Sequence, residues 1–263
     1  MKPPARAVRR YGNAPFTAAV IHGGPGAAGE MAPVAQELAA RGFGVLEPWQ
    51  AEASVAGQIR ELKQQLETAC AGPAILIGFS WGAWLACLLA AQHPELVSRL
   101  VLIGCPPFAE EYAAGIGAAR QARLRPSEQE ELNGLFRGTG METPGGLERA
   151  LQLLEKAEAY APAAQGRSAL VFDRHIFETV WPEAAGLRRS GALLREAARI
   201  RCPVAALHGD HDPHPAAGVE LPLRKRLPDF RFHLLQRCGH KPWIEAHAAP
   251  GFFQVLEQVI TPS

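Results

Sequence analysis

The chain has 263 residues, of which 48% are apolar and 20% charged, a composition typical of a globular protein with a sizeable core. Its formal net charge of +1 gives no reason to expect nucleic acid or an anionic membrane as a partner. No apolar run reaches the roughly 18 residues of a membrane span, and the basic start is not followed by the apolar segment of a signal peptide. We therefore expect a small-molecule partner; the sequence indicates no oligomeric state.

The five cysteines are odd in number and scattered, and none forms a C-x-x-C pair. This pattern is typical of reduced thiols in a reducing compartment. It predicts a cytoplasmic protein.

Short apolar runs alternate with helical patterns along the chain, which predicts an α/β fold with a mostly parallel central sheet flanked by helices. Most of the runs are apolar throughout, as expected for strands covered on both faces. The expected strands are residues 18–21, 43–46, 74–77, 100–103, 204–207 and 230–235, with an antiparallel edge strand at 6–9. Helices are expected at 55–66, with Ser54 as the cap, at 80–93 and at 252–260.

One long region, residues 106–200, breaks this alternation and contains no convincing strand. Its helical patterns cover residues 110–124, 128–136, 147–160, 174–180 and 184–199, and a glycine-rich loop covers 138–146. Ser127 and Glu130 have the spacing of a capping box. An insertion of this length is more than a connection. The sequence thus predicts a core domain of residues 1–105 and 201–263, interrupted by a helical cap of residues 106–200.

A candidate nucleophile lies in the segment Gly78-Phe79-Ser80-Trp81-Gly82, a G-x-S-x-G motif between an expected strand and an expected helix. The serine of such a motif sits on a tight strand-to-helix turn, and glycines flank it because side chains there would collide with the turn. The helix N-terminus also favours a developing negative charge. A G-x-S-x-G pattern can also occur by chance. The assignment of Ser80 as the nucleophile therefore depends on finding a base and an acid elsewhere in the sequence.

A serine hydroxyl needs a base, and the base needs a third group to orient it. His240 follows the expected strand 230–235, and both Asp210 and Asp212 follow the strand 204–207. The carboxyl ends of parallel strands share one edge of the sheet, where sites usually form. The order serine, aspartate, histidine is that of α/β-hydrolases. His240 is therefore the expected base, and either aspartate could be the acid.

Three histidines in the same segment, His208, His211 and His214, allow a metal site as an alternative. All of them follow a single strand, and no other segment offers a matching pair of ligands. We therefore expect no metal and no cofactor, with His208 packed at the strand end and His211 and His214 facing solvent.

A glycine-rich loop, His22-Gly23-Gly24-Pro25-Gly26, follows the expected strand 18–21. Such a loop lets the backbone approach a ligand and present N–H groups to it. A phosphate-binding loop is the alternative, but neither G-x-G-x-x-G nor the G-K-[ST] ending is present.

Together, these motifs and the C-terminal segment CGHKPWIE resemble those of α/β-hydrolases with a helical cap, most of all proline iminopeptidase-type enzymes. The resemblance covers the frame on both sides of the cap, about two thirds of the chain. It implies that the acid is Asp212, four residues after the histidine of the H-G pair. It also implies an oxyanion hole formed by the amides of Gly24 and Trp81, with His22 supporting the loop.

The chain departs from those peptidases at residues 47–54, EPWQAEAS, where their aspartate-arginine-glycine signature is absent. The leading hypothesis is therefore a serine hydrolase that acts by acyl transfer on a small or medium ester, thioester or amide. The alternatives are an aminopeptidase, a lyase that uses the same triad, and a binding protein that has lost turnover. The aminopeptidase would need an acidic group for the substrate ammonium, and the candidates in the cap are Glu142, Asp173 and Glu178.

Overall fold

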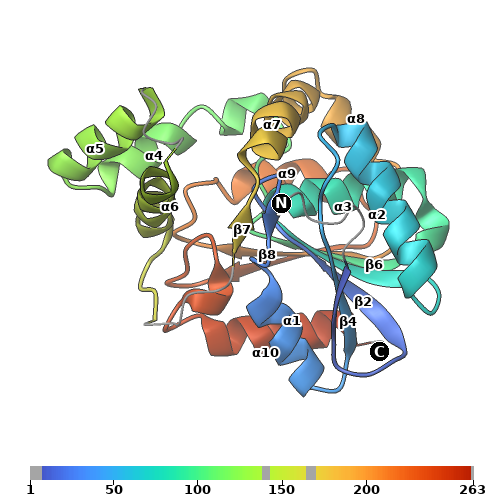
Figure 1. Ribbon diagram of the computed structural model, residues 1–263. Coiled ribbons are helices and arrows are strands. Elements are labelled where there is room, and N and C mark those ends of the chain that lie inside the picture. The colour runs from blue at the N-terminus through green and yellow to red at the C-terminus, as the bar shows by residue number, and fades with distance from the viewer. Residues whose placement is uncertain (1–7, 138–142, 164–169, 262–263) are drawn as a thin grey trace.

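The computed structural model describes residues 8–137, 143–163 and 170–261, and its centre is a seven-stranded sheet (Figure 1). The strand order is β1-β4-β2-β5-β6-β8-β9. Only β1 runs antiparallel to its neighbour, so the fold is the expected mostly parallel α/β fold. The strands are β1 (Val8–Tyr11), β2 (Phe16–Ile21), β4 (Gly44–Pro48), β5 (Ala74–Phe79), β6 (Val97–Ile103), β8 (Val204–Gly209) and β9 (Phe230–Leu235).

The central strands are buried because helices cover both faces of the sheet. Alternate residues of β2 belong to different clusters: Ala19 and Ile21 pack on one face, and Ala18 and Val20 on the other. The first face is covered by α2 (Val55–Ala69), α3 (Trp81–Gln92) and α9 (Ala217–Arg224), and the second by α1 (Ala32–Ala40) and α10 (Ala249–Ile260). This two-sided cover explains why the strands read as continuous apolar runs.

The expected helices of the frame are confirmed, and two others escaped prediction. Ser54 caps α2, where its hydroxyl accepts a hydrogen bond from the Gly57 amide at 3.0 Å. The unpredicted helices are α1, which begins next to a proline, and α9, which contains Pro222. Among the described residues, the helices are too short or too polar to span a bilayer.

The segment between β6 and β8 contributes no strand to the central sheet within its described residues, and its helices form two groups. The first group is α4 (Ile116–Ala122), α5 (Pro126–Arg137) and α6 (Pro144–Glu158), which lie away from the sheet and share a small apolar cluster around Leu132 and Leu153 (Figure 1). The second is α7 (Arg174–Arg189) and α8 (Ala192–Ala197), whose apolar residues join the core cluster beside α3. As far as residues 143–163 and the other described parts of the segment show, only the first group has an apolar cluster of its own.

Several details of this segment differ from the prediction. The capping box at Ser127 is wrong, because α5 already begins at Pro126. A short strand, β7 (Val171–Phe172), pairs with β3 (Ala27–Ala28), although no strand was expected in either place. The helix α7 continues through Pro182 and ends before Gly191, which has a φ of +70°. Glu142 and much of the predicted glycine-rich loop lie outside the described residues.

Candidate functional site

Ser80 occupies a strained turn between β5 and α3. Its φ of 50° lies in the left-handed region, which side chains other than glycine rarely adopt and which is associated with functional sites. A Cβ at Gly78 would lie 2.4 Å from the carbonyl oxygen of Gly82, and a Cβ at Gly82 would lie 2.2 Å from that of Ile21. Both flanking positions therefore require glycine. Ser80 is partly exposed, whereas Phe79 and Trp81 on either side of it are buried.

Trp81 is the first residue of α3, and amides in the first turn of a helix have no carbonyl one turn earlier to accept their hydrogen bonds. Its indole is fully buried and donates to the Gln58 side-chain oxygen at 2.9 Å. This hydrogen bond holds Trp81, the residue after Ser80, in place.

The glycine-rich loop after β2 is held in shape by Gln50, a residue that the sequence did not mark. The Gln50 side-chain nitrogen Nε2 donates to the His22 carbonyl at 2.8 Å, and the side-chain oxygen Oε1 accepts from the Gly26 backbone amide at 3.2 Å. Burial lowers the pKa of His22 to about 4, so its ring is neutral at pH 7. His22 Nε2 can then accept the Gln50 backbone amide at 3.4 Å, which agrees with a supporting role in the loop.

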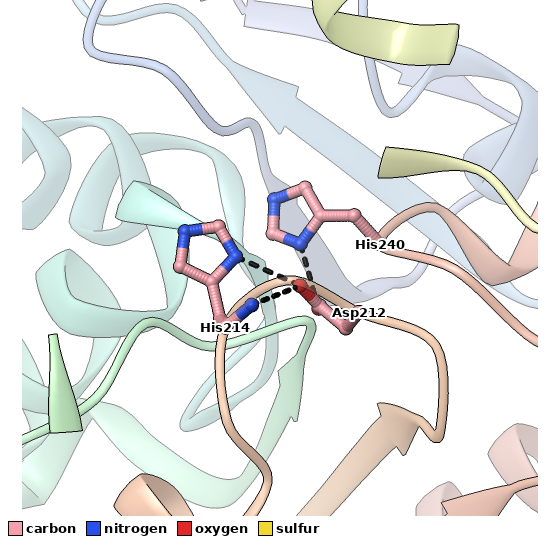
Figure 2. A group of neighbouring side chains, drawn as sticks. All are labelled: Asp212, His214 and His240. Carbon is pink, nitrogen blue, oxygen red and sulfur yellow. Dashed lines mark hydrogen bonds and ion pairs between the residues drawn. The ribbon is translucent and has the colours of Figure 1, made fainter. Parts of the chain in front are cut away.

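Asp212 and His240 meet at the carboxyl ends of β8 and β9. His240 Nδ1 lies 2.7 Å from Asp212 Oδ2, and both residues are buried (Figure 2). Burial raises the pKa of Asp212, but the interactions with His240, His214 and His208 outweigh it and hold this pKa well below its usual range. Asp212 is thus an anion that orients the His240 ring.

Asp210, the alternative acid, has a different partner. Its Oδ1 accepts the backbone amide of Cys238 at 3.0 Å and so holds the loop that carries His240. The structure therefore brings Asp212, rather than Asp210, onto the His240 ring.

The His240 ring also packs against the turn that carries Ser80. Its centroid lies 4.8 Å from that of the Phe79 ring, and a Cβ at Gly104 would lie 3.0 Å from His240 Nδ1. Within the part of the chain that the structure describes, no hydrogen bond joins the Ser80 hydroxyl to His240. The contact between nucleophile and base therefore stays a prediction.

His214, which we expected to face solvent, is buried beside Asp212, and this expectation is wrong. The ligand atoms of Asp212, His214 and His240 lie within 4.8 Å of one another, which is close enough for a shared metal ion. However, the Nδ1 atoms of His214 and His240 lie 2.8 Å and 2.7 Å from separate oxygens of Asp212. These are the distances of N–H donors on a carboxylate, so the group fits a hydrogen-bonded cluster better than a set of metal ligands.

The helical segment contributes two further polar residues, Arg120 and Glu158. Arg120 Nε donates to Glu158 Oε1 at 2.8 Å, and the Glu158 carbonyl accepts the His240 amide at 3.0 Å. Burial lowers the pKa of His240, but the Asp212 and Glu158 carboxylates outweigh it, so this pKa lies above its usual value.

Replacing Glu158 with glutamine is therefore expected to lower the pKa of His240, because it removes a negative charge that stabilises the protonated ring. Histidine ring C–H signals followed by NMR as a function of pH would show a midpoint above about 6.5 in the unsubstituted chain and a lower one in E158Q. The matched control is E155Q on the same helix, because Glu155 contacts Lys241 instead. An unchanged midpoint in E158Q would show that Glu158 does not set this pKa.

A row of aromatic rings leads from the glycine-rich loop to α3. Phe172 Cε2 would lie 4.0 Å from a Cβ at Gly24, and the Phe172 and Phe177 centroids are 5.6 Å apart. Trp181 stacks on Phe177 at 6.3 Å and on Trp84 at 5.8 Å. Two further aromatic residues of the segment 106–200 do not belong to this row: Phe108 is fully buried in the core, and Tyr112 is partly exposed.

Two of the carboxylates considered for an ammonium site are already engaged. Asp173 caps α7, with its Oδ1 accepting the Ile176 amide at 3.1 Å. Glu178 pairs with Arg174 at 2.6 Å on the exposed face of the same helix. Neither carboxylate is held in readiness for a substrate amine.

The chain matches the model of the alpha/beta hydrolase fold family over residues 20–246. It is 32% identical over 178 residues to a pimeloyl-[acyl-carrier protein] methyl ester esterase of Aromatoleum aromaticum, covering 65% of this chain and 68% of that one. It is 28% identical over 202 residues to a 2-hydroxy-6-oxononadienedioate/2-hydroxy-6-oxononatrienedioate hydrolase of Paraburkholderia phymatum, covering 75% and 65%. The alignments span about one third to two thirds of the length of such curated relatives.

Solved structures show the same fold at lower identity. The structure of VinJ superposes with a TM-score of 0.69 at 21% identity, covering 98% of this chain and 99% of that one. The proline iminopeptidase of Mycobacterium smegmatis superposes with a TM-score of 0.63 at 16% identity, covering 95% and 92%.

Proposed function

Because the chain belongs to the alpha/beta hydrolase fold family and its named relatives are hydrolases and esterases, we propose that it is a serine hydrolase with Ser80, Asp212 and His240 as its catalytic triad. The observation that carries the proposal is the buried hydrogen bond of 2.7 Å between Asp212 and His240, next to a serine on a strained turn. The substrate is a small or medium ester, thioester or amide.

In this mechanism the Ser80 hydroxyl attacks the substrate carbonyl while His240 Nε2 takes its proton. The amides of Gly24 and Trp81 stabilise the negative charge on the carbonyl oxygen, aided by the N-terminus of α3. His240 then gives the proton to the leaving group, which departs from the acyl-enzyme. Water attacks the acyl carbon with His240 again as the base, and the proton returns to Ser80 as the acid is released.

We assign residues 106–200 the role of a cap over a core of residues 1–105 and 201–263. Two features support this role. The helices α4 to α6 have their own small apolar cluster, and Arg120 and Glu158 connect these helices to the His240 loop. The aromatic row of Phe172, Phe177 and Trp181 adds an apolar wall beside Gly24, which suits an apolar acyl group.

An ester is the favoured substrate, and a relative whose name describes a methyl ester esterase supports this choice. The aminopeptidase alternative is weaker, because Asp173 and Glu178 are engaged in structural contacts. A lyase could use the same triad, and a binding protein would lack turnover altogether. The unpaired cysteines favour the cytoplasm as the place of action.

Neutral acyl esters are expected to be turned over faster than matched aminoacyl substrates with a free amine. Burying an unpaired ammonium costs several kcal/mol, so kcat/KM should differ by more than about 100-fold. The measurement compares pairs of substrates that differ only in that amine. A preference for the free amine that disappears on N-acetylation would reverse our choice between esterase and aminopeptidase.

The proposed function as a whole is tested by a panel of p-nitrophenyl esters and aminoacyl arylamides. A burst of p-nitrophenol equal to the enzyme concentration, followed by slower steady turnover, would indicate an acyl-enzyme that is slow to hydrolyse. The absence of any turnover across the panel would favour the binding protein.

A further inference from the structure

The second oxygen of Asp212 is as fully engaged as the first. While Oδ2 accepts from His240, Oδ1 lies 2.9 Å from the His214 backbone amide and 2.8 Å from His214 Nδ1 (Figure 2). Hydrogen bonds to a charged acceptor are the stronger kind, and these three contacts together fix the orientation of the carboxylate. The carboxylate therefore cannot rotate without breaking a contact to His214.

The protonation of His214 follows from its surroundings. Burial lowers its pKa to about 4, so the ring is neutral at pH 7 and carries a single N–H. Because Nδ1 faces the Asp212 carboxylate, that proton belongs on Nδ1 and leaves Nε2 as an acceptor. An Arg120 Nη2 lies 3.3 Å from this Nε2 and supplies the donor.

Other contacts hold the His214 ring and backbone in place. Its ring centroid lies 4.5 Å from that of His240, so the two imidazoles pack against each other. The His214 carbonyl accepts from His208 Nε2 at 2.8 Å, which places all of His208, His214 and Asp212 in one buried group. No role in the acyl-transfer mechanism above requires His214.

Arg120, on α4, connects this helix to the group of Asp212, His214 and His240. Its Nη2 lies between His214 Nε2 and Glu158 Oε1, its Nε also donates to Glu158, and the Glu158 carbonyl accepts the His240 backbone amide. A shift of α4 relative to the sheet would thus reach Asp212 through His214.

We propose that His214 is a positioning residue, which holds Asp212 in the orientation that His240 requires and is itself anchored to α4 by Arg120. The inference rests on the proposed triad. It adds His214 as a fourth side chain beside that triad. It also gives a physical link, through Arg120 on α4, by which the helical segment influences the orientation of Asp212.

The test compares two substitutions of His214 with a matched histidine control. H214F keeps a ring but removes both nitrogens, so kcat for a p-nitrophenyl ester is expected to fall about tenfold with KM unchanged. H214N keeps an amide N–H close to the place of Nδ1 and should fall only about threefold. The control is H211F in the same loop, because the His211 ring packs on Tyr160 and should leave kcat within about twofold.

The link to Arg120 is tested by a double-mutant cycle. R120M is expected to lower kcat about threefold in the unsubstituted chain and by a smaller factor in H214N, which has no Nε2 for Arg120 to bind. The loss that remains in H214N reflects the contact of Arg120 with Glu158. An equal loss on R120M in the unsubstituted chain and in H214N would show that Arg120 does not act through His214. H214N retains a polar side chain, so the double-mutant cycle still tests the role of His214 if H214F fails to fold.

A spectroscopic readout separates this inference from the proposed function. A proton on His240 Nδ1 that is hydrogen-bonded to Asp212 at 2.7 Å is expected to be strongly deshielded, and its NMR signal in ¹⁵N-histidine-labelled protein does not depend on turnover. H214F should shift or broaden this signal, and H214N should restore it. If both variants leave the signal and kcat unchanged, His214 does not position Asp212; if the unsubstituted chain shows the signal but no turnover, only the proposed function fails.

Discussion

Replacing Ser80 with alanine is expected to lower kcat by about 10⁴-fold or more, because alanine has no oxygen with which to form the acyl-enzyme. The fold should survive. The Ser80 hydroxyl makes no capping hydrogen bond, and alanine keeps the Cβ that the turn already accommodates. Ester turnover and thermal unfolding measured on the same preparation would show both effects.

A second serine provides the matched control. Ser54 also precedes a helix, but its hydroxyl caps α2 through the Gly57 amide. S54A should therefore lose about 1 kcal/mol of unfolding free energy and keep its kcat, the opposite of the result for S80A. Near-normal activity in S80A would rule out the acyl-enzyme mechanism.

Exchanging each aspartate of the β8 loop for asparagine is expected to give very unequal results. In D212N an uncharged amide replaces the anion between His240 and His214, and the base loses its correct tautomer, so kcat should fall about 10⁴-fold. In D210N the remaining carbonyl oxygen can still accept the Cys238 amide, so kcat should change little.

The control for this pair is the stability of each variant. Urea or thermal unfolding should show that both variants are folded under the assay conditions. A loss of activity then reflects a change in the site. If D210N is the more damaging of the two, the choice of Asp212 as the acid is wrong.

The parts of the fold that depend on local pattern could be predicted from the sequence. The strands of the central sheet are continuous apolar runs because both faces are covered, and the turn at Ser80 depends on two glycines only a few residues away. The helix at Ser54 follows from its cap. Each of these signals lies within one short stretch of chain.

The contacts that assemble several segments could not be predicted in this way. Gln50 holds the glycine-rich loop 28 residues before it in the chain, and Arg120 reaches His214 across 94 residues. Nothing in the residues around Gln50 or Arg120 distinguishes them from ordinary surface residues. The pairing of β3 with β7 was missed for a related reason, because strands of two residues have no periodicity to detect.

His214 shows why a correct motif can still give a wrong environment. The sequence places it two residues after Asp212 in a loop, where a histidine usually faces solvent. In the fold, the loop turns back so that both its amide and its Nδ1 reach the carboxylate. Only the three-dimensional arrangement indicates that this histidine belongs with the acid.

The central claim, that Ser80 carries the acyl group, is tested most directly by trapping the intermediate. The enzyme is mixed with a p-nitrophenyl ester, quenched in acid within the burst, and digested for peptide mass spectrometry. The account predicts the mass of the acyl group on the peptide that contains Ser80, in an amount equal to the burst, and no such adduct in S80A. Product formation with Ser80 unmodified at every quench time, or an adduct on a different residue, would contradict it.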